Sequence, residues 1–285
     1  MARPFVKWAA EVHRVEDLPR YVHRAVKTAL APPTGPVFLS LPGDSLKSDA
    51  DIDLLEPTRV APRVRGDADA VAAAAELLAK AERPVIIAGD AVAQSRAHKE
   101  LAALAEAIGA PVYVEFIPNT ASFPASHPLY RGSMTRTQAG VREVLHQHDL
   151  LFSVGGDLFT WSLPSNIDPW PKGLPLIHLD SDPWQIGKNY PAQVAILGDP
   201  KATLPDITAA VSARMGASAK SAAAARLKST TDAIKKDRQA FRAKARALAG
   251  KTPVQPRALL EAIGAMVPKD AVVIEEVLSS SPGAR

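Results

Sequence analysis

The sequence has 285 residues, of which 47% are hydrophobic, and a formal net charge of +4 at pH 7. A chain of this length can form about two domains with a sizeable core. It contains no cysteine, which excludes disulfides and thiolate metal sites. It has neither a run of about 18 apolar residues that could span a membrane nor, at its start, the apolar stretch of a signal peptide. We therefore expect a cytoplasmic protein with no membrane partner.

The first 65 residues are predicted to contain a partial domain and a linker. Apolar residues recur at helical spacing over residues 15–30, and residues 37–42 are an apolar run that ends at a proline. One helix and one strand cannot bury a core alone, so we expect residues 1–47 to be the tail of a larger domain. Residues 48–65, rich in Asp, Pro and Arg, are predicted to be a linker.

The central part of the chain, residues 66–213, carries a repeated strand and helix pattern. Short apolar runs bounded by proline, glycine or aspartate are typical of parallel strands that helices cover on both faces. The alternation with helical segments indicates an α/β fold with a doubly wound parallel sheet. The predicted strands lie within residues 83–90, 111–115, 149–155, 175–180 and 193–199.

Turn and capping residues predict where the central helices begin and end. Asp67 or Asp69 can cap a helix that runs through residue 80, and Ser95 can cap a helix over residues 96–108 that ends at Gly109. Residues 116–134 are expected to be a loop. Further helices are predicted over residues 137–148 and 200–211.

The last part of the chain is predicted to be a basic helix followed by the start of another domain. Residues 214–252 are rich in alanine and basic residues, with single apolar residues seven positions apart at Leu227, Ile234, Phe241 and Leu248. This stripe is too narrow for a coiled coil and favours a linker helix on a neighbouring domain. Because only Phe241 adds an aromatic ring among the charges, we expect no nucleic-acid partner. Residues 253–285 should contain a helix over 256–266 and a strand over 271–274.

No self-contained catalytic motif is found, so candidate sites come from the ends of the predicted strands, where open α/β sheets bind ligands. Gly155 and Gly156 let the backbone approach a ligand, although a tight turn explains them equally well. Asp180 can accept hydrogen bonds from ribose hydroxyls, but local capping at Asp182 explains this segment too. The run 279–281 consists of serines that can bind a phosphate at a helix start or simply cap that helix.

Taken together, these segments resemble the family of thiamine-diphosphate-dependent 2-oxo-acid decarboxylases and carboligases, particularly its benzoylformate decarboxylase-type members. Residues 3–8 and the predicted strand within 35–42 resemble the end of the pyrimidine-binding domain of that family. Residues 256–281 resemble the opening of its diphosphate-binding domain. The segments similar to its central domain are 83–90, 109–112, 127–132 and 177–183.

The resemblance implies an enzyme, a lyase or transferase, that uses thiamine diphosphate and Mg²⁺ to cleave or ligate C–C bonds next to a carbonyl, most simply by decarboxylating a 2-oxo acid. It implies that Glu276, Ser279 and Ser280 lie near the cofactor diphosphate. The activating glutamate and the metal-binding Gly-Asp-Gly…Asn segment of the family have no counterpart here. We therefore expect this chain to be an internal portion of a longer enzyme and to be inactive alone.

One segment departs from the family. Benzoylformate decarboxylase-type members bring a histidine to the reacting carbon on the loop after the fourth central strand, and Ser162 aligns there. Serine cannot replace imidazole as a general acid or base near neutral pH. The neighbouring Trp161 would favour a bulky apolar group on the substrate.

Two alternative functions remain open from the sequence. One is an acetolactate-synthase-like carboligase whose central domain binds FAD or an adenine nucleotide through Asp180 and the glycine loop at 155. The other is a non-catalytic module with a nucleotide-binding sheet. Relatives act as dimers or tetramers, so the resemblance also implies a homo-oligomer.

Overall fold

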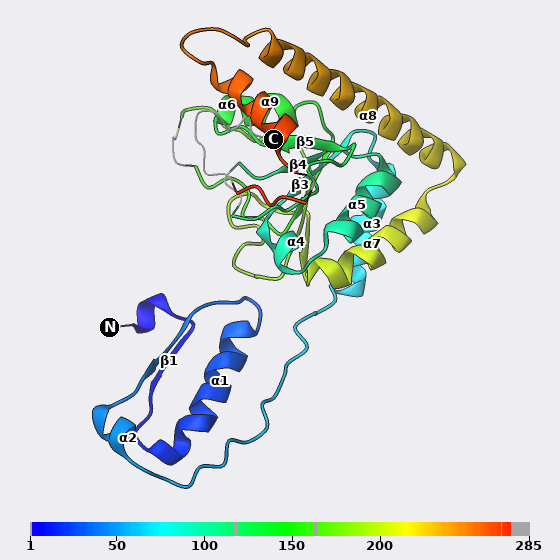
Figure 1. Cartoon of the computed structure of the whole chain (residues 1–285). Coiled ribbons are helices and arrows are strands. Elements are labelled where there is room, and N and C mark those ends of the chain that lie inside the picture. The colour runs from blue at the N-terminus through cyan, green and yellow to red at the C-terminus, as the bar shows by residue number, and fades with distance from the viewer. Residues whose placement is uncertain (1, 117–118, 162–164, 269, 275–285) are drawn as a thin grey trace.

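The computed structural model in Figure 1 describes residues 2–116, 119–161, 165–268 and 270–274. Its first part contains two strands and a helix that covers them. The elements of this part, in chain order, are η1 (Arg3–Phe5), β1 (Trp8–Glu11), η2 (Val15–Asp17), α1 (Leu18–Leu30), β2 (Val37–Ser40) and α2 (Gly43–Lys47). In the described chain no helix is both long and apolar enough to cross a bilayer.

Strand β1 is the strand of this part that the sequence did not reveal; the short helices η1, η2 and α2 were not predicted either. It pairs in parallel with β2, in a register that joins Trp8 to Val37, and these two strands form a sheet of their own. The predicted helix and the predicted strand at 37–42 are both confirmed. Strand β1 was missed because its apolar run is short and contains two alanines, which are depleted in strands, and its extended form depends on pairing with a partner far along the sequence.

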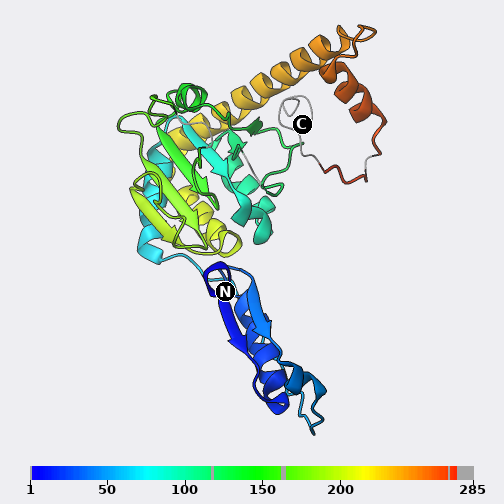
Figure 2. The same cartoon turned by 90° about the vertical axis from the view of Figure 1, so that its left-hand side faces the viewer.

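An extended segment leads from this part to the central domain. Residues 48–65 contain no helix or strand, and Figure 2 shows the blue first part joined to the rest of the molecule by this single connection. The boundaries that the sequence suggested, at 47, 65, 213 and 252, stay predictions.

The central domain is an α/β fold built on a six-stranded parallel sheet, as predicted. The strand order is β5-β4-β3-β6-β7-β8, and every neighbouring pair is parallel. The strands are β3 (Pro84–Ala88), β4 (Val112–Val114), β5 (Tyr130–Ser133), β6 (Leu150–Val154), β7 (Leu176–Asp180) and β8 (Val194–Leu197). The helices are α3 (Ala68–Lys80), α4 (Asp90–Gln94), α5 (His98–Ile108), α6 (Gln138–Leu145) and α7 (Pro200–Arg214).

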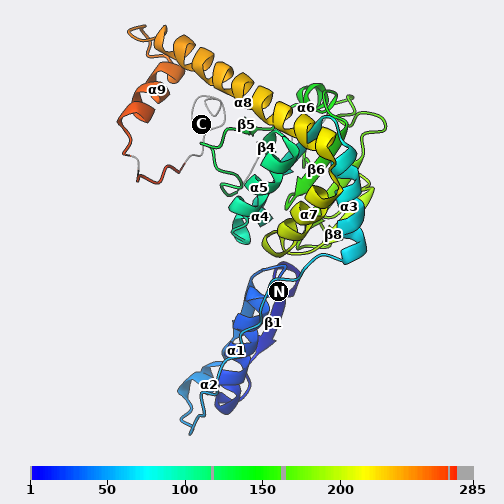
Figure 3. The same ribbon diagram turned by 90° about the vertical axis from the view of Figure 1, so that its right-hand side faces the viewer.

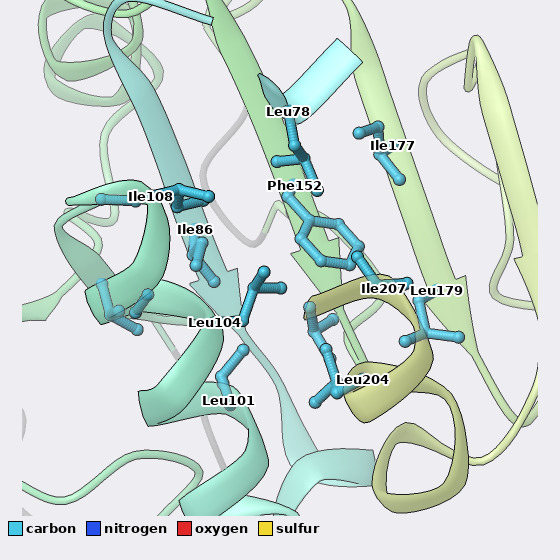
Figure 4. Close-up of a cluster of buried hydrophobic side chains, with 14 of the residues drawn as sticks. Leu78, Ile86, Leu101, Leu104, Ile108, Phe152, Ile177, Leu179, Leu204 and Ile207 are labelled. Carbon is cyan, nitrogen blue, oxygen red and sulfur yellow. The ribbon is translucent and has the colours of Figure 1, made fainter. Parts of the chain in front are cut away.

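Both faces of this sheet are covered. Alternate residues of one strand enter different clusters because side chains alternate across a strand. Ile86 and Phe152 pack with residues of α3, α5 and α7, as Figure 4 shows. Val85 and Leu151 instead join a second cluster with residues of α6. Burial on both faces explains why these strands are apolar runs without polar alternation.

Three predictions, a helix cap, a loop and a strand, differ from the structure. Ser95 does not cap the following helix; it ends α4, where its hydroxyl donates to the Ala91 carbonyl at 2.7 Å. The expected loop at 116–134 contains β5, which a strand pairing with β4 creates. The predicted strand at 271–274 is wrong, because these residues form no strand and their three large apolar side chains are exposed. No described strand pairs with them.

A 30-residue helix, α8 (Ala217–Arg246), leads away from the central domain to α9 (Pro256–Met266), as Figure 3 shows. Its first half is anchored where Gly109 ends α5 in a left-handed conformation. There the Arg226 guanidinium donates to the Ile108 carbonyl at 2.9 Å. Of the predicted stripe, Leu227 packs on the central core and Ile234 is buried. The basic helix thus lies on its neighbouring domain from its first half as far as Arg238, whose guanidinium donates to the Ala125 carbonyl at 2.8 Å.

Candidate functional site

The strand order reverses between β3 and β6, and this point organises the candidate site. From β3 the chain continues outward to β4 and β5, whereas β6, β7 and β8 extend in the opposite direction. In open α/β sheets the crevice at such a switch point, beyond the carboxyl ends of the strands, is where ligands bind. Here it is formed by the turns that follow β3 and β6.

The glycines at this point are required by close packing of these two turns. A Cβ atom on Gly89 would lie 2.3 Å from the Gly155 carbonyl oxygen, and one on Gly156 would lie 2.4 Å from Glu115 Oε1. Gly155 also has a φ of +72°, a conformation that favours glycine. Its N–H donates to the Leu179 carbonyl and the Gly89 N–H to the Val154 carbonyl. These amides are therefore engaged within the sheet and do not point to a ligand.

A cavity of about 520 Å³ opens beside these turns. Gly155, Gly156 and Asp180 line it, so the structure brings three of the sequence-predicted site residues together. Carboxylates outnumber cations in its lining. The acids are Asp90, Glu115, Asp157, Asp180, Asp182 and Asp199, and the facing cations are Arg63 and Arg96. These carboxylates would repel the negatively charged diphosphate of a dinucleotide, which weighs against the alternative in which the central domain binds one.

Two of these carboxyl groups have strongly altered acidity. Burial, followed by the charge of Asp157, raises the pKa of Glu115 to about 8, against the effect of the hydrogen bond from Leu158 N–H. Burial also raises the pKa of Asp180 to about 6, although the backbone amide of Asp182 donates to its carboxylate at 2.8 Å. Perturbed groups of this kind gather at functional sites.

Asp180 and Asp182 are held by local turns. Asp182 accepts a hydrogen bond from the backbone N–H of Trp184 at 2.9 Å, but no helix follows it. Asp182 therefore closes a single turn and does not cap a helix, contrary to what the sequence had suggested. Asp180 is 3% exposed, so its side chain offers little surface to a ribose.

His178 is a buried member of the site that sequence reasoning missed. The Gly187 N–H donates to its Nδ1 at 3.2 Å, and its Nε2 therefore carries the proton and donates to the Gly156 carbonyl at 2.8 Å. Burial lowers the pKa of His178, which keeps the ring neutral. The ring joins the turn after β6 to the segment after β7. A histidine inside an apolar strand was the signal that could have identified it.

Asp90 connects the switch point to the segment after β4. Its carboxylate accepts hydrogen bonds from the Asn119 side chain and from the Thr120 hydroxyl, both at 2.7 Å. It lies two residues after the end of β3, and Glu115 follows β4 directly; these positions after strands were the signal available in the sequence. Its carboxylate is therefore occupied by hydrogen bonds that fix the segment at Asn119 and Thr120.

Trp161 belongs to a cluster of aromatic rings on the α6 side of the sheet. It stacks on Phe116 with ring centroids 5.5 Å apart and lies 5.4 Å from Phe159. Its indole N–H donates to the Tyr190 hydroxyl at 3.4 Å. The ring is thus packed, with part of its surface accessible.

The other predicted site residues, Ser162, Glu276, Ser279 and Ser280, lie outside the described residues. Among the residues that are described, no group of three or more His, Cys, Asp or Glu side chains could hold a metal ion. The described part of the chain therefore does not fit Mg²⁺.

Comparisons with known proteins agree with this architecture. Residues 71–207 match the family described as "Thiamine pyrophosphate enzyme, central domain". Benzoylformate decarboxylase of Pseudomonas aeruginosa is 28% identical over 284 residues, which are 98% of this chain and 50% of that protein. The "Probable acetolactate synthase large subunit" of Methanocaldococcus jannaschii is 34% identical over 216 residues, covering 73% of this chain and 36% of that protein.

A solved structure supports the same assignment. The benzoylformate decarboxylase of Polynucleobacter necessarius superposes with a TM-score of 0.79 and 26% identity, over 100% of this chain and 50% of that one. The two benzoylformate decarboxylases match nearly all of this chain, yet the chain spans only about half of their length. It belongs to the thiamine pyrophosphate enzymes, and its residues 71–207 are their central domain.

Proposed function

We propose that this chain is part of a longer thiamine-diphosphate-dependent enzyme that decarboxylates a 2-oxo acid of the benzoylformate type. One observation carries the proposal: the similarity to benzoylformate decarboxylases extends over 98–100% of the chain, whereas the acetolactate synthase relative matches 73%. The central domain is common to several reactions, so the flanking segments supply the discrimination.

The cofactor supplies the carbanion-stabilising chemistry in such an enzyme. No described side chain takes a catalytic step in this proposal, because no cluster of described side chains could hold Mg²⁺. Contacts of Glu276, Ser279 and Ser280 with the diphosphate remain part of the proposal. So does the role of Trp161 and Ser162 beside the substrate, where the partly accessible indole would favour an aromatic substituent on the 2-oxo acid.

The enzyme that contains this chain should release CO₂ from benzoylformate in the presence of thiamine diphosphate and Mg²⁺. Pyruvate serves as the comparison substrate, since a carboligase would condense two pyruvate molecules. Formation of acetolactate without turnover of benzoylformate would contradict the proposal. A yellow protein with bound flavin would favour the alternative in which the central domain holds FAD.

The 285-residue chain alone provides a second test. A ligand that binds the folded state raises the melting temperature by mass action. We expect no shift with thiamine diphosphate and Mg²⁺ up to millimolar concentration, because the activating glutamate and the metal-binding Gly-Asp-Gly…Asn segment of the family have no counterpart in this sequence. A saturable, Mg²⁺-dependent shift would show that the chain holds a complete cofactor site. Light scattering of the complete enzyme would test the proposed dimer or tetramer.

A further inference from the structure

The turn after β6, residues 155–161, has an unusual backbone. Leu158 and Phe159 both have positive φ angles, of 46° and 70°, and each side chain is 1% exposed. Residues other than glycine adopt this region at an energetic cost and remain there only when their surroundings hold them. We call residues 155–161 the β6 turn.

Polar side chains from the segments after β4 and β7 hold the β6 turn. Glu115, directly after β4, accepts a hydrogen bond from the Leu158 N–H through Oε1 at 2.9 Å. Asn189, in the segment after β7, donates to the carbonyls of Asp157 and Leu158 at 3.0 and 3.1 Å. The Leu158 N–H is the amide of a residue in a strained conformation, so the acceptor that binds it stabilises that conformation.

We propose that Glu115 is a positioning residue, whose neutral carboxyl group donates a hydrogen bond to Asp157 while it accepts one from the Leu158 N–H, and thereby fixes the β6 turn and Trp161. A protonated carboxyl group can donate and accept at once, whereas a carboxylate only accepts. Glu115 also precedes Phe116, the ring on which Trp161 stacks. The importance of Trp161 for the substrate rests on the proposed function; the positioning itself does not.

The charges around Glu115 favour its neutral form. The carboxylates of Asp157 and Asp90 face it, and burial together with their charge raises the pKa of Glu115 to about 8. Lys188 lies 3.6 Å from Asp157 and partly offsets that charge. Two further titratable groups at this edge of the sheet change protonation below pH 8. Burial raises the pKa of Asp180 only to about 6, and burial lowers the pKa of His178.

Loss of the proton should loosen the β6 turn. Ionised Glu115 and ionised Asp157 would repel each other at short range, and the donated hydrogen bond would be lost. The Leu158 amide would then open more often, and the packing of Trp161 on Phe116 would weaken. The stabilisation should be lost as the pH rises towards 8, the pKa of Glu115 in the closed turn.

Hydrogen exchange of the 285-residue chain tests this proposal. The rate for peptides covering the β6 turn is measured between pH 6 and pH 9.5 and divided by the intrinsic rate at each pH. Because the pKa of Glu115 is raised from 4.5 to about 8 in the closed turn, protection of the Leu158 amide should fall by up to about tenfold per pH unit as the pH rises from 6 towards 8 and level off above pH 8. Quenching of Trp161 emission, identified by comparison with Trp161→Phe, should rise over the same range.

Glu115→Gln is the decisive variant, because glutamine keeps the length of the side chain and can donate and accept without ionising. Its β6 turn should stay protected at pH 9. Glu115→Ala should lose protection at every pH. The exposed Glu143→Gln variant is the matched control and should follow the wild type.

A wild-type β6 turn whose protection does not change up to pH 9.5 would overturn the proposal. So would a Glu115→Gln variant with the same pH-dependent loss as the wild type. Neither readout depends on turnover, so the proposal can fail while the decarboxylase assignment stands, and the reverse also holds.

Discussion

The central domain and the flanking segments contain similar apolar patterns but bury them to very different extents. In β3, β6 and β7 every residue is buried, whereas no residue of β1, β2 or α9 is buried in the described chain. The difference is one of layers: six strands are covered on both faces, while β1 and β2 have α1 on one side. The same kind of sequence therefore contributes much more stability in the central domain.

Exposed apolar side chains on the flanks make the same point. On α1, Val22, Val26 and Leu30 follow one another at intervals of four residues, and they are 39%, 52% and 66% exposed. On α9, Met266 is 83% exposed. The regular spacing gives each helix an apolar face, but the described chain does not cover these faces. Four substitutions, each with a counterpart in a flank or on the surface, can break or sharpen this comparison.

The largest effect is expected for Phe152→Ala in β6. Phe152 is fully buried between β6 and the helices, so its truncation should lower the free energy of unfolding by about 3–5 kcal/mol. Phe38→Ala in β2, where the ring is 47% exposed, should lower it by less than about 1 kcal/mol. Urea denaturation followed by circular dichroism would measure both. Equal effects would show that the flank is as well packed as the centre.

A change in pH dependence is expected for Asp180→Asn. Because the pKa of Asp180 is raised to about 6 in the folded state from 3.8, its stabilising contribution is complete below about pH 4 and lost as the pH rises to 6. The wild type should therefore lose up to about 3 kcal/mol relative to the variant across this window. Unfolding curves at pH 4, 5, 6 and 7 would measure this, with exposed Asp51→Asn as control. Parallel wild-type and variant curves would contradict it.

A smaller effect is expected for Gly89→Ala at the switch point. The new methyl group would meet the Gly155 carbonyl oxygen at 2.3 Å, and separation of the two turns should cost about 1–3 kcal/mol. At Gly43, in the first flank, a Cβ atom meets nothing within 4 Å, so Gly43→Ala should be neutral. Calorimetric melting temperatures would compare them. A neutral Gly89→Ala variant would show that the turns separate easily.

The smallest effect is expected at the helix starts. Asp67 caps α3 by accepting hydrogen bonds from the amides of Asp69 and Ala70, and its replacement by alanine should cost about 1 kcal/mol. Gln255 stands at the same position before α9 but makes no such hydrogen bond, so Gln255→Ala should leave the melting temperature unchanged. An equal loss in both variants would mean that side-chain capping does not explain the difference.

Local sequence signals were sufficient for most central elements. The predicted strands from 83–90 to 193–199 all formed, because uninterrupted apolar runs bounded by turn residues have few other ways to be buried. The helix after Asp67 and the helix end at Gly109 formed as expected, since capping depends on neighbouring residues. The long basic helix was also predictable from its composition.

Elements that depend on distant partners were not predictable. Strand β5 carries no apolar run and β1 only a short one with two alanines, and both became strands by pairing with distant partners, β4 and β2. Residues 271–274 have strand-like composition, yet no described strand pairs with them and they form none. Pairing decides such segments, because a strand gains its hydrogen bonds from another part of the chain.

The sequence by itself determined the α/β class, the central strands and the family resemblance that the comparisons confirmed. It also pointed to the edge of the sheet where Gly155, Gly156 and Asp180 line one cavity, because strand ends and glycines are local features. Only the tertiary structure brought Glu115, Asp157 and His178 together, from three different parts of the chain. The acidity of Glu115 and His178 and the hydrogen bonds of this group arise from burial and proximity, and neither is contained in the order of residues along the chain.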